Sequence, residues 1–204
     1  MQINNQELEV KFYITDLNKL KSRLKTLRAK ISQPRTYERN LRFDKPDGEL
    51  LRSLQVLRLR EDSSVRLTYK GPGQTLNGVH LRKEIEFTAS DFDAAQAFLE
   101  ALGYQVQMMY EKYRMVFELE GVLVTLDEMP FGDFVELEGP DAEHIYNANQ
   151  KVGLNWDARI LESYTSLFDG LRSTHNFSFR DLSFDNFKRL SVTPDDLNVI
   201  PADL

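Results

Sequence analysis

Charged and apolar residues alternate along every extended segment of this sequence, and no other feature constrains the fold as strongly. Residues 7–12 read Glu-Leu-Glu-Val-Lys-Phe, so a strand here would carry its charges on one face and its apolar side chains on the other. The same two-faced pattern predicts further strands at residues 36–44, 54–60, 64–70, 82–87, 106–119, 122–128 and 134–138. Any fold of this chain must therefore provide a place for both faces of each strand.

Two amphipathic helices interrupt the strands and reveal an internal repeat. Asp16 is the predicted N-cap of a helix of roughly 15 residues, whose leucines recur at helical spacing and whose last apolar position is Ile31. A second helix is predicted to start at a capping box in residues 90–93 and to end at Gly103. Its apolar face carries Phe92, Phe98, Leu99 and Leu102. Each helix follows one strand and precedes three, so the chain contains two copies of a strand-helix-strand-strand-strand unit.

Glycine and proline predict the turns between these elements. Residues 46–48, Pro-Asp-Gly, indicate a turn after the second strand, because proline presets one dihedral angle and glycine accepts a positive one. Residues 71–73, Gly-Pro-Gly, are predicted to close the far end of the hairpin formed by the third and fourth strands. Beyond residue 140 the pattern becomes helical, with helices predicted at 142–152 and 158–171.

Two topologies can accommodate these strands. In the ordinary one, a β-sandwich buries the apolar faces and leaves the charges in water. In the other, a barrel turned inside out places the apolar faces outward beneath the helices and the charges around a tunnel. The second is favoured because the charged faces carry few Thr, Ser, Gln or Asn residues, arginines are doubled on one strand, and both helices need an apolar surface. The predicted fold is therefore α+β, an eight-stranded antiparallel closed β-barrel with a charged interior and helices packed outside.

The charged faces carry slightly more bases than acids. The nine bases are Lys11, Arg42, Arg58, Arg60, Arg66, Lys70, Arg82, Lys112 and Arg114, and the seven acids are Glu7, Glu9, Glu84, Glu86, Asp127, Glu136 and Glu138. So many charges in a confined space are unfavourable unless they are paired. Carboxylates coordinate Mg²⁺ or Mn²⁺ through oxygen, and arginine and lysine bind phosphate oxygens. We therefore expect a small polyanion to bind here together with Mg²⁺ or Mn²⁺.

Composition excludes several other functions. The formal net charge of −6 opposes general nucleic-acid binding, and the lack of cysteine rules out disulfides, thiolate catalysis and cysteine-ligated zinc. The three histidines form no close metal-ligand pair. No apolar run approaches the length of a membrane span, and the first residues lack the basic-then-apolar plan of a signal peptide. We expect a cytoplasmic protein with neither a nucleic-acid nor a membrane partner.

The ordered series of charged motifs resembles the CYTH superfamily, the triphosphate tunnel metalloenzymes. The series is ExExK at 7–11, RxR at 58–60, a lysine before a Gly-Pro turn at 70, ExE at 84–86, KxR at 112–114, an isolated Asp127 and a final ExE at 136–138. This resemblance covers about residues 5–170. It implies a CYTH triphosphate tunnel domain at residues 1–170 and leaves 171–204 as a C-terminal extension. The extension is aromatic-rich, and packing on the domain or on a second subunit of a homodimer are both open.

The resemblance also implies roles for the charged residues. The implied metal ligands are Glu7, Glu9 and Glu138 for a metal that contacts the phosphates, and Glu86, Asp127 and Glu136 for a second metal or its waters, with Glu84 completing its ExE pair. The implied phosphate ligands are Lys11, Arg58, Arg60, Lys70, Lys112 and Arg114. Lys11 and Lys70 are the predicted catalytic residues. Three further candidates for phosphate binding share the inner face by alternation alone, namely Arg42, Arg66 and Arg82.

More than one reaction fits these residues. In a hydrolase, a metal-activated water attacks the terminal phosphorus; in a class four adenylyl cyclase, the ribose 3′-hydroxyl of ATP attacks the α-phosphorus and pyrophosphate leaves. Several segments resemble bacterial sequences of the cyclase group, whereas the tyrosine typical of animal thiamine triphosphatases is missing from residues 41–44, Leu-Arg-Phe-Asp. We expect a triphosphatase, with inorganic triphosphate as the plainest substrate. An adenylyl cyclase and a non-catalytic polyphosphate- or nucleotide-binding module are the alternatives.

Overall fold

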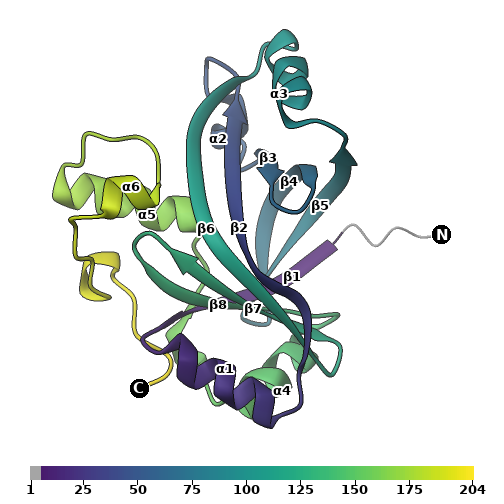
Figure 1. Cartoon of the computed structure of the whole chain (residues 1–204), viewed down its shortest axis with the longest axis vertical. Coiled ribbons are helices and arrows are strands. Elements are labelled where there is room, and N and C mark those ends of the chain that lie inside the picture. The colour runs from purple at the N-terminus through teal and green to yellow at the C-terminus, as the bar shows by residue number, and fades with distance from the viewer. Residues whose placement is uncertain (1–5) are drawn as a thin grey trace.

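The eight predicted strands form one antiparallel sheet that closes into a ring (Figure 1). The structure is a computed structural model and describes residues 6–204. The strands are β1 (Gln6–Ile14), β2 (Lys30–Asp44), β3 (Val56–Glu61), β4 (Val65–Leu76), β5 (Val79–Ala89), β6 (Gln105–Leu119), β7 (Val122–Met129) and β8 (Gly132–Glu138). Neighbours follow the order β5-β4-β3-β2-β6-β7-β8-β1, and the pairing of β1 with β5 completes the ring. A two-residue strand, β9 (Arg159–Ile160), adds to β1.

Two copies of the predicted repeat build this ring. In chain order they are β1-α1-β2-β3-β4 and β5-α3-β6-β7-β8, with the short helix α2 inserted in the first copy. The helices are α1 (Leu17–Thr26), α2 (Glu49–Arg52), α3 (Phe92–Ala101), α4 (Ala142–Val152), α5 (Tyr164–His175) and α6 (Phe184–Phe187), with 3₁₀ turns at Trp156–Ala158 and Asp195–Leu197. Among residues 6–204, no helix is both long and apolar enough to cross a membrane.

The apolar faces of the strands point outward and are covered by helices. α1 and α4 pack beside each other on β1 and β6–β8 (Figure 1), where Leu24, Phe117 and Ile145 are fully buried. α3 contributes Phe92 and Leu99 to a smaller cluster on the outside of β2 and β3. Because side chains alternate along a strand, the charged faces are left to the inside of the ring. The inside-out topology predicted from the sequence is confirmed.

The C-terminal part of the chain packs on the outside of the same ring (Figure 1). Leu182 lies beside β6 and makes two backbone hydrogen bonds with it. The N–H of Leu182 donates to the carbonyl of Met109 (2.9 Å), and the carbonyl of Leu182 accepts from the N–H of Glu111 (3.0 Å). The Asp203 carboxylate accepts from the backbone N–H of Thr15 (2.9 Å), at the end of β1. An aromatic core joins this segment to the strands, and its members include Tyr13, Phe131, Phe134, Tyr164, Phe168 and Phe187. The domain boundary expected at residue 170 lies inside α5.

The first helix is shorter than predicted. It ends at Thr26, because Arg28 adopts a positive φ of 59° and the N–H of Ala29 bonds back to the carbonyl of Leu24 (3.0 Å), which closes the helix with a Schellman-type turn. Ile31, predicted as the last apolar position of this helix, instead lies in β2 and is 54% exposed. The helical spacing of Ile31 was therefore coincidental.

The two later helices also differ from their predictions. The helix predicted at 158–171 begins only at Tyr164, where the Ser163 hydroxyl caps it, because the preceding residues pair with β1 as β9. On α3, Phe92 and Leu99 are buried as predicted, but Phe98 and Leu102 are 63% and 53% exposed. Only part of the predicted apolar face of α3 therefore packs on the sheet.

The predicted turn at residues 71–73 is wrong. β4 continues through this segment to Leu76, and two of its residues oppose one on β5 between the pairs Lys70–Glu84 and Gly73–Arg82. A bulge of this kind tolerates proline, because the irregular position needs no ladder hydrogen bond. The turn that follows β4 lies instead at Asn77 and Gly78 and leads into β5. Their φ values of 51° and 80° match the Asn-Gly sequence favoured in two-residue turns.

Candidate active site

The ring encloses a cavity of about 760 Å³ whose wall consists largely of charged side chains. Fourteen of the sixteen predicted site residues line it: Glu7, Glu9, Lys11, Arg42, Arg58, Arg60, Lys70, Arg82, Glu84, Glu86, Lys112, Arg114, Glu136 and Glu138. The alternation along the strands therefore brings acids and bases from seven strands around a single space.

Two predicted site residues do not line the cavity. Arg66 turns toward the loop between β3 and β4, where it donates to Asp62 (3.0 Å). Asp127 of β7 is fully buried behind the wall. Its carboxylate accepts from Arg114 Nε (2.7 Å) and Nη2 (2.5 Å), from Lys112 Nζ (3.0 Å) and from the hydroxyl of Tyr164 (2.9 Å). Four donors occupy this carboxylate, so its position suits holding the two bases rather than binding an ion.

Three carboxylates, which we call the acidic cluster, lie together where β1 meets β8: Glu7, Glu9 and Glu138. Glu9 and Glu138 are directly opposite each other in the β1–β8 register. Burial raises the pKa of Glu9, and repulsion from Glu136 raises it further, although Lys11 opposes the shift. Burial, Glu7 and Glu9 together raise the pKa of Glu138 to about 7. Among the described residues, neither Glu9 nor Glu138 forms an ion pair, so two of the three carboxylates in the acidic cluster have no directly paired cation.

Lys70 connects this cluster with β5. Its Nζ lies 2.6 Å from a carboxylate oxygen of Glu7 and 3.1 Å from one of Glu84. Burial still raises the pKa of Glu7, because Glu84 adds repulsion while Lys70 compensates only in part. The ammonium group of Lys70 thus forms ion pairs with two carboxylates. Within residues 6–204, Glu7 is the one carboxylate of the acidic cluster that has a cation at ion-pair distance.

A second group of side chains, which we call the cation network, lies on β1, β3 and β6–β8. Its bases are Lys11, Arg60, Lys112 and Arg114. Lys11 and Arg114 contact the Glu136 carboxylate at 3.1 and 2.6 Å. Despite burial, these two bases and Lys112 hold the pKa of Glu136 well below its usual range. Glu136 is therefore ionised and matched by positive charge, in contrast to Glu9 and Glu138.

Arg42 and Arg58 form the remaining part of the basic wall. They are paired in the β2–β3 register, and Arg58 donates to Thr68 Oγ1 (3.2 Å) and, more weakly, to the Tyr110 hydroxyl (3.4 Å). Arg42 donates to Thr165 Oγ1 (3.0 Å) and forms no ion pair within residues 6–204. Arg58 lies 3.6 Å from Glu86, its one carboxylate at ion-pair distance among the described residues, so these two neighbouring guanidinium groups share a single ion pair and favour an anionic ligand.

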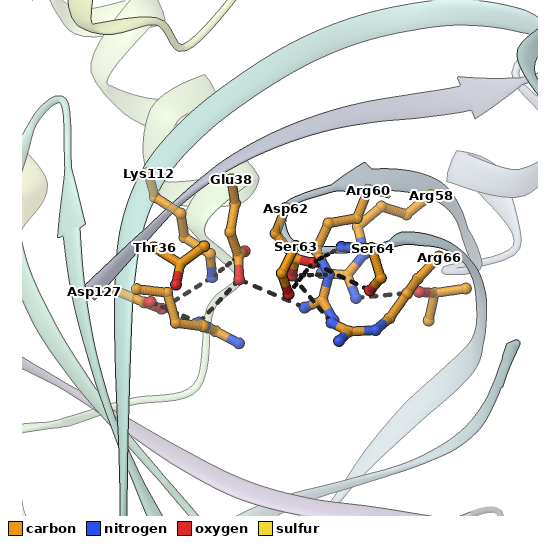
Figure 2. A network of polar contacts seen from close by, with 12 residues as sticks. Thr36, Glu38, Arg58, Arg60, Asp62, Ser63, Ser64, Arg66, Lys112 and Asp127 are labelled. Carbon is orange, nitrogen blue, oxygen red and sulfur yellow. Dashed lines mark hydrogen bonds and ion pairs between the residues drawn. The ribbon is translucent and has the colours of Figure 1, made fainter. Parts of the chain in front are cut away.

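Sequence reasoning missed Glu38. This residue of β2 is fully buried, and Figure 2 shows it between Lys112 on one side and Arg60 on the other. Lys112, Arg114 and Arg60 lower the pKa of Glu38 against the effect of burial. The signal was available in the sequence: Glu38 has the same strand parity as Arg42, which was assigned to the inner face.

Sequence reasoning also missed Tyr164, at the start of α5. Its hydroxyl donates to Asp127 (2.9 Å), and Lys11 Nζ lies 4.4 Å from its ring centroid. The adjoining carbonyl of Glu162 accepts from Lys11 (3.5 Å). Nothing in the strand pattern could place this residue, because α5 follows the last long strand by more than twenty residues and reaches the cavity only through tertiary packing.

Comparison with known proteins now decides the family. The CYTH domain family matches residues 5–151, most of the segment that forms the ring and its cavity. The chain belongs to the CYTH family. Members of this family are typically enzymes, either triphosphatases or adenylyl cyclases, and they generally use divalent metals. The resemblance inferred from the charged motifs is confirmed.

Solved structures with this fold agree with the family assignment. A candidate adenylate cyclase from Vibrio parahaemolyticus is 23% identical, with a TM-score of 0.72 over 80% of this chain and 97% of its own. A conserved hypothetical protein from Pyrococcus furiosus is 25% identical, with a TM-score of 0.66 over 78% of this chain and 98% of its own. A Hippeastrum protein described as an adenylyl cyclase candidate with a dominant triphosphatase activity is 18% identical, with a TM-score of 0.62 over 80% and 95%. No curated protein matches the chain.

The acidic cluster has the chemistry of a divalent-cation site. It offers carboxylate oxygens, the ligands that Mg²⁺ and Mn²⁺ prefer, and within residues 6–204 two of these carboxylates, Glu9 and Glu138, have no ion-pair partner. Within the described part of the chain, no three acidic or histidine side chains are already gathered around one point as a metal site would require. Glu7 is turned toward Lys70 (2.6 Å), which is the contact that an ion bound by all three carboxylates would have to replace.

Proposed function

We propose that this CYTH protein is a divalent-metal-dependent hydrolase of a triphosphate, with inorganic triphosphate as its simplest substrate. The observation that carries the proposal is the segregation of charge in one cavity. Two carboxylates that form no ion pair within residues 6–204, Glu9 and Glu138, line the same cavity as Arg42, a base that forms none there either. A metal-bound polyphosphate satisfies both parts at once, because its cation neutralises the carboxylates and its oxygens bind the bases.

The residues would divide the work as follows. Glu7, Glu9 and Glu138 would hold Mg²⁺ or Mn²⁺, which when bound neutralises phosphate charge and activates water. Lys11, Lys112 and Arg114 would contact one stretch of the phosphate chain, and Arg42, Arg58, Arg60 and Arg82 would contact the rest. Lys70, released from Glu7 when a cation binds there, would become free to donate to a phosphate oxygen. Glu136 and Asp127 would keep Lys11, Lys112 and Arg114 in place.

Hydrolysis needs little beyond this arrangement. Water adds to the terminal phosphorus, the bridging P–O bond breaks, and its electron pair leaves with pyrophosphate. Negative charge shifts during this step onto oxygens that face fixed lysine and arginine donors, which stabilise the transition state without reorganising. The lack of cysteine and the absence of a close histidine pair in the sequence are therefore no obstacle to the reaction.

The aromatic residues of the cavity support hydrolysis over cyclisation of ATP. Those that line it within residues 6–204 are Tyr110 and Tyr164, apart from the imidazole of His80. Both tyrosines are more than nine-tenths buried. The Tyr164 ring faces Lys11, and the Tyr110 hydroxyl contacts Arg58. Neither ring is free to stack on an adenine, whereas inorganic triphosphate needs no such surface.

A substrate panel tests this proposal. Purified protein is supplied with tripolyphosphate, ATP or thiamine triphosphate, each with Mg²⁺, Mn²⁺ or EDTA, and both phosphate and cyclic AMP are measured. We expect phosphate release from tripolyphosphate in the presence of metal and none with EDTA. Cyclic AMP as the main product from ATP would replace the proposal with a cyclase. Tight binding of tripolyphosphate without any product would replace it with a binding module.

A further inference from the structure

Glu38 is a fully buried carboxylate beside the cavity. Both of its oxygens are buried and neither accepts a hydrogen bond. Three cavity-lining cations surround it at ion-pair distances: Arg60 Nη1 at 3.7 Å, Lys112 Nζ at 3.7 Å and Arg114 Nε at 4.0 Å. The proposed mechanism gives this buried charge no task.

The three cations have closer partners than Glu38. Lys112 is 3.0 Å from Asp127, and Arg114 lies 2.5 Å from Asp127 and 2.6 Å from Glu136. Arg60 lies 3.4 Å from Asp62, and Figure 2 shows both residues beside Glu38. These contacts fix the positions of the bases. Glu38 adds negative charge at longer range and no directional bond.

We propose that Glu38 is a charge-balancing residue, which weakens the attraction of the cavity for polyanions and leaves the positions of the phosphate-binding bases to other carboxylates. The inference rests on the proposed binding of a triphosphate among these bases. Glu38 adds a negative charge close to three cavity-lining bases, and the ligand cannot displace it, because its side chain, like that of Asp127, is fully buried behind the wall.

If Glu38 has this role, removing a side chain of the cavity region should increase the affinity for a polyanion instead of reducing it. At an effective dielectric constant of about 20, one unit charge about 7 Å from a phosphate changes affinity by tenfold or more. Removing the negative charge of Glu38 should therefore tighten polyanion binding. Pyrophosphate, the product, presents the same kind of phosphate oxygens to the same bases, so it should also bind more tightly and leave more slowly.

The test compares Glu38→Gln with wild type. The dissociation constant for tripolyphosphate is measured by calorimetry in EDTA, so that no turnover occurs. Glu38→Gln keeps the shape of the side chain, and we expect it to bind tripolyphosphate at least tenfold more tightly. Glu118→Gln changes the net charge equally but at an exposed site on β6, and its affinity should stay within about twofold of wild type. Glu38→Asp, which keeps the charge, should stay within about threefold.

The outcomes separate this inference from the proposed function. Equal or weaker binding by Glu38→Gln, with wild type binding normally, would overturn the charge-balancing role alone and leave Glu38 as a structural ion-pair partner. Wild type that binds no tripolyphosphate in EDTA but hydrolyses it with Mg²⁺ or Mn²⁺ would overturn the charge-balancing role alone. Wild type that neither binds tripolyphosphate in EDTA nor hydrolyses it with metal would remove both proposals. If Glu38→Gln unfolds without ligand, tripolyphosphate should restore the fold by supplying the missing negative charge. Failure to restore it would again count against the inference.

Discussion

Two groups of glutamates on the wall of one cavity behave in opposite ways. In the acidic cluster, burial and mutual repulsion raise the pKa values of Glu9 and Glu138, the latter to about 7. In the cation network, Lys11 and Arg114 hold the pKa of Glu136 well below its usual range, and the neighbouring bases also lower the pKa of Glu38. The residue type is the same and the burial is similar. What differs is the positive charge within reach.

This contrast separates four of the seven acids that the family resemblance assigns to metal binding. Glu9 and Glu138 form no ion pair within the described residues, so a divalent ion would relieve their repulsion. Glu136 and Asp127 are already engaged by lysine and arginine, so an ion there would have to displace several strong bonds. We therefore assign the first pair to metal binding and the second pair to holding the bases. The three predictions below test this division, from the largest effect to the smallest.

Replacing a carboxylate of the acidic cluster should have the largest effect. Glu9→Gln removes one metal ligand while keeping the side-chain shape, so we expect the rate of tripolyphosphate hydrolysis to fall by about a thousandfold or more. The rate is measured at saturating Mn²⁺ and the Mn²⁺ affinity by calorimetry, with Glu118→Gln as the matched control. A variant with full activity and unchanged Mn²⁺ affinity would show that the acidic cluster is not the metal site.

Asp127→Asn should act on stability rather than on metal binding. It removes the charge that faces Arg114 and Lys112 in a fully buried position, so the free energy of unfolding should fall by about 3 kcal/mol. Urea denaturation with EDTA measures the loss, and the Mn²⁺ affinity of the folded variant should be close to that of wild type. Lost Mn²⁺ affinity with little loss of stability would instead make Asp127 a metal ligand.

The smallest effect concerns pH. The pKa of Glu138 rises from 4.5 to about 7 on folding, so the folded state binds more protons between these values. Its contribution to stability is present below pH 4.5 and is lost as pH rises through 7. In EDTA, the melting temperature of wild type should fall over this range by about 5 °C more than that of Glu138→Gln. Saturating Mn²⁺ should remove the difference between the two proteins. If their melting temperatures in EDTA fell equally with rising pH, Glu138 would not be a carboxylate whose negative charge destabilises the fold.

The fold and most of the cavity wall could be predicted from the sequence because strand alternation has a period of two. Once Lys11 or Arg58 is assigned to the inner face, its neighbours two positions away follow, and the same rule would have included Glu38. Predictions from local composition failed where pairing between strands determined the structure instead. Residues 71–73 have the composition of a turn but form a bulge within β4.

Contacts that depend on distant packing could not be predicted at all. Tyr164 reaches Asp127 only because α5 packs against the ring, and no periodicity in the sequence encodes that contact. The four hydrogen bonds that Asp127 accepts also depend on packing between distant segments. Strand alternation correctly predicted which face of β7 carries Asp127. The register between β6 and β7 and the packing of α5 bring the four donors to its carboxylate.

A structure of the protein with Mn²⁺ and a non-hydrolysable triphosphate would test the central claim most directly. We predict one strong anomalous peak within bonding distance of Glu7, Glu9 and Glu138, with Lys70 withdrawn from Glu7 and phosphate oxygens on Lys11, Arg58 and Arg114. Manganese bound at Glu136 and Asp127 instead, or phosphates on the outside of the ring, would contradict the account.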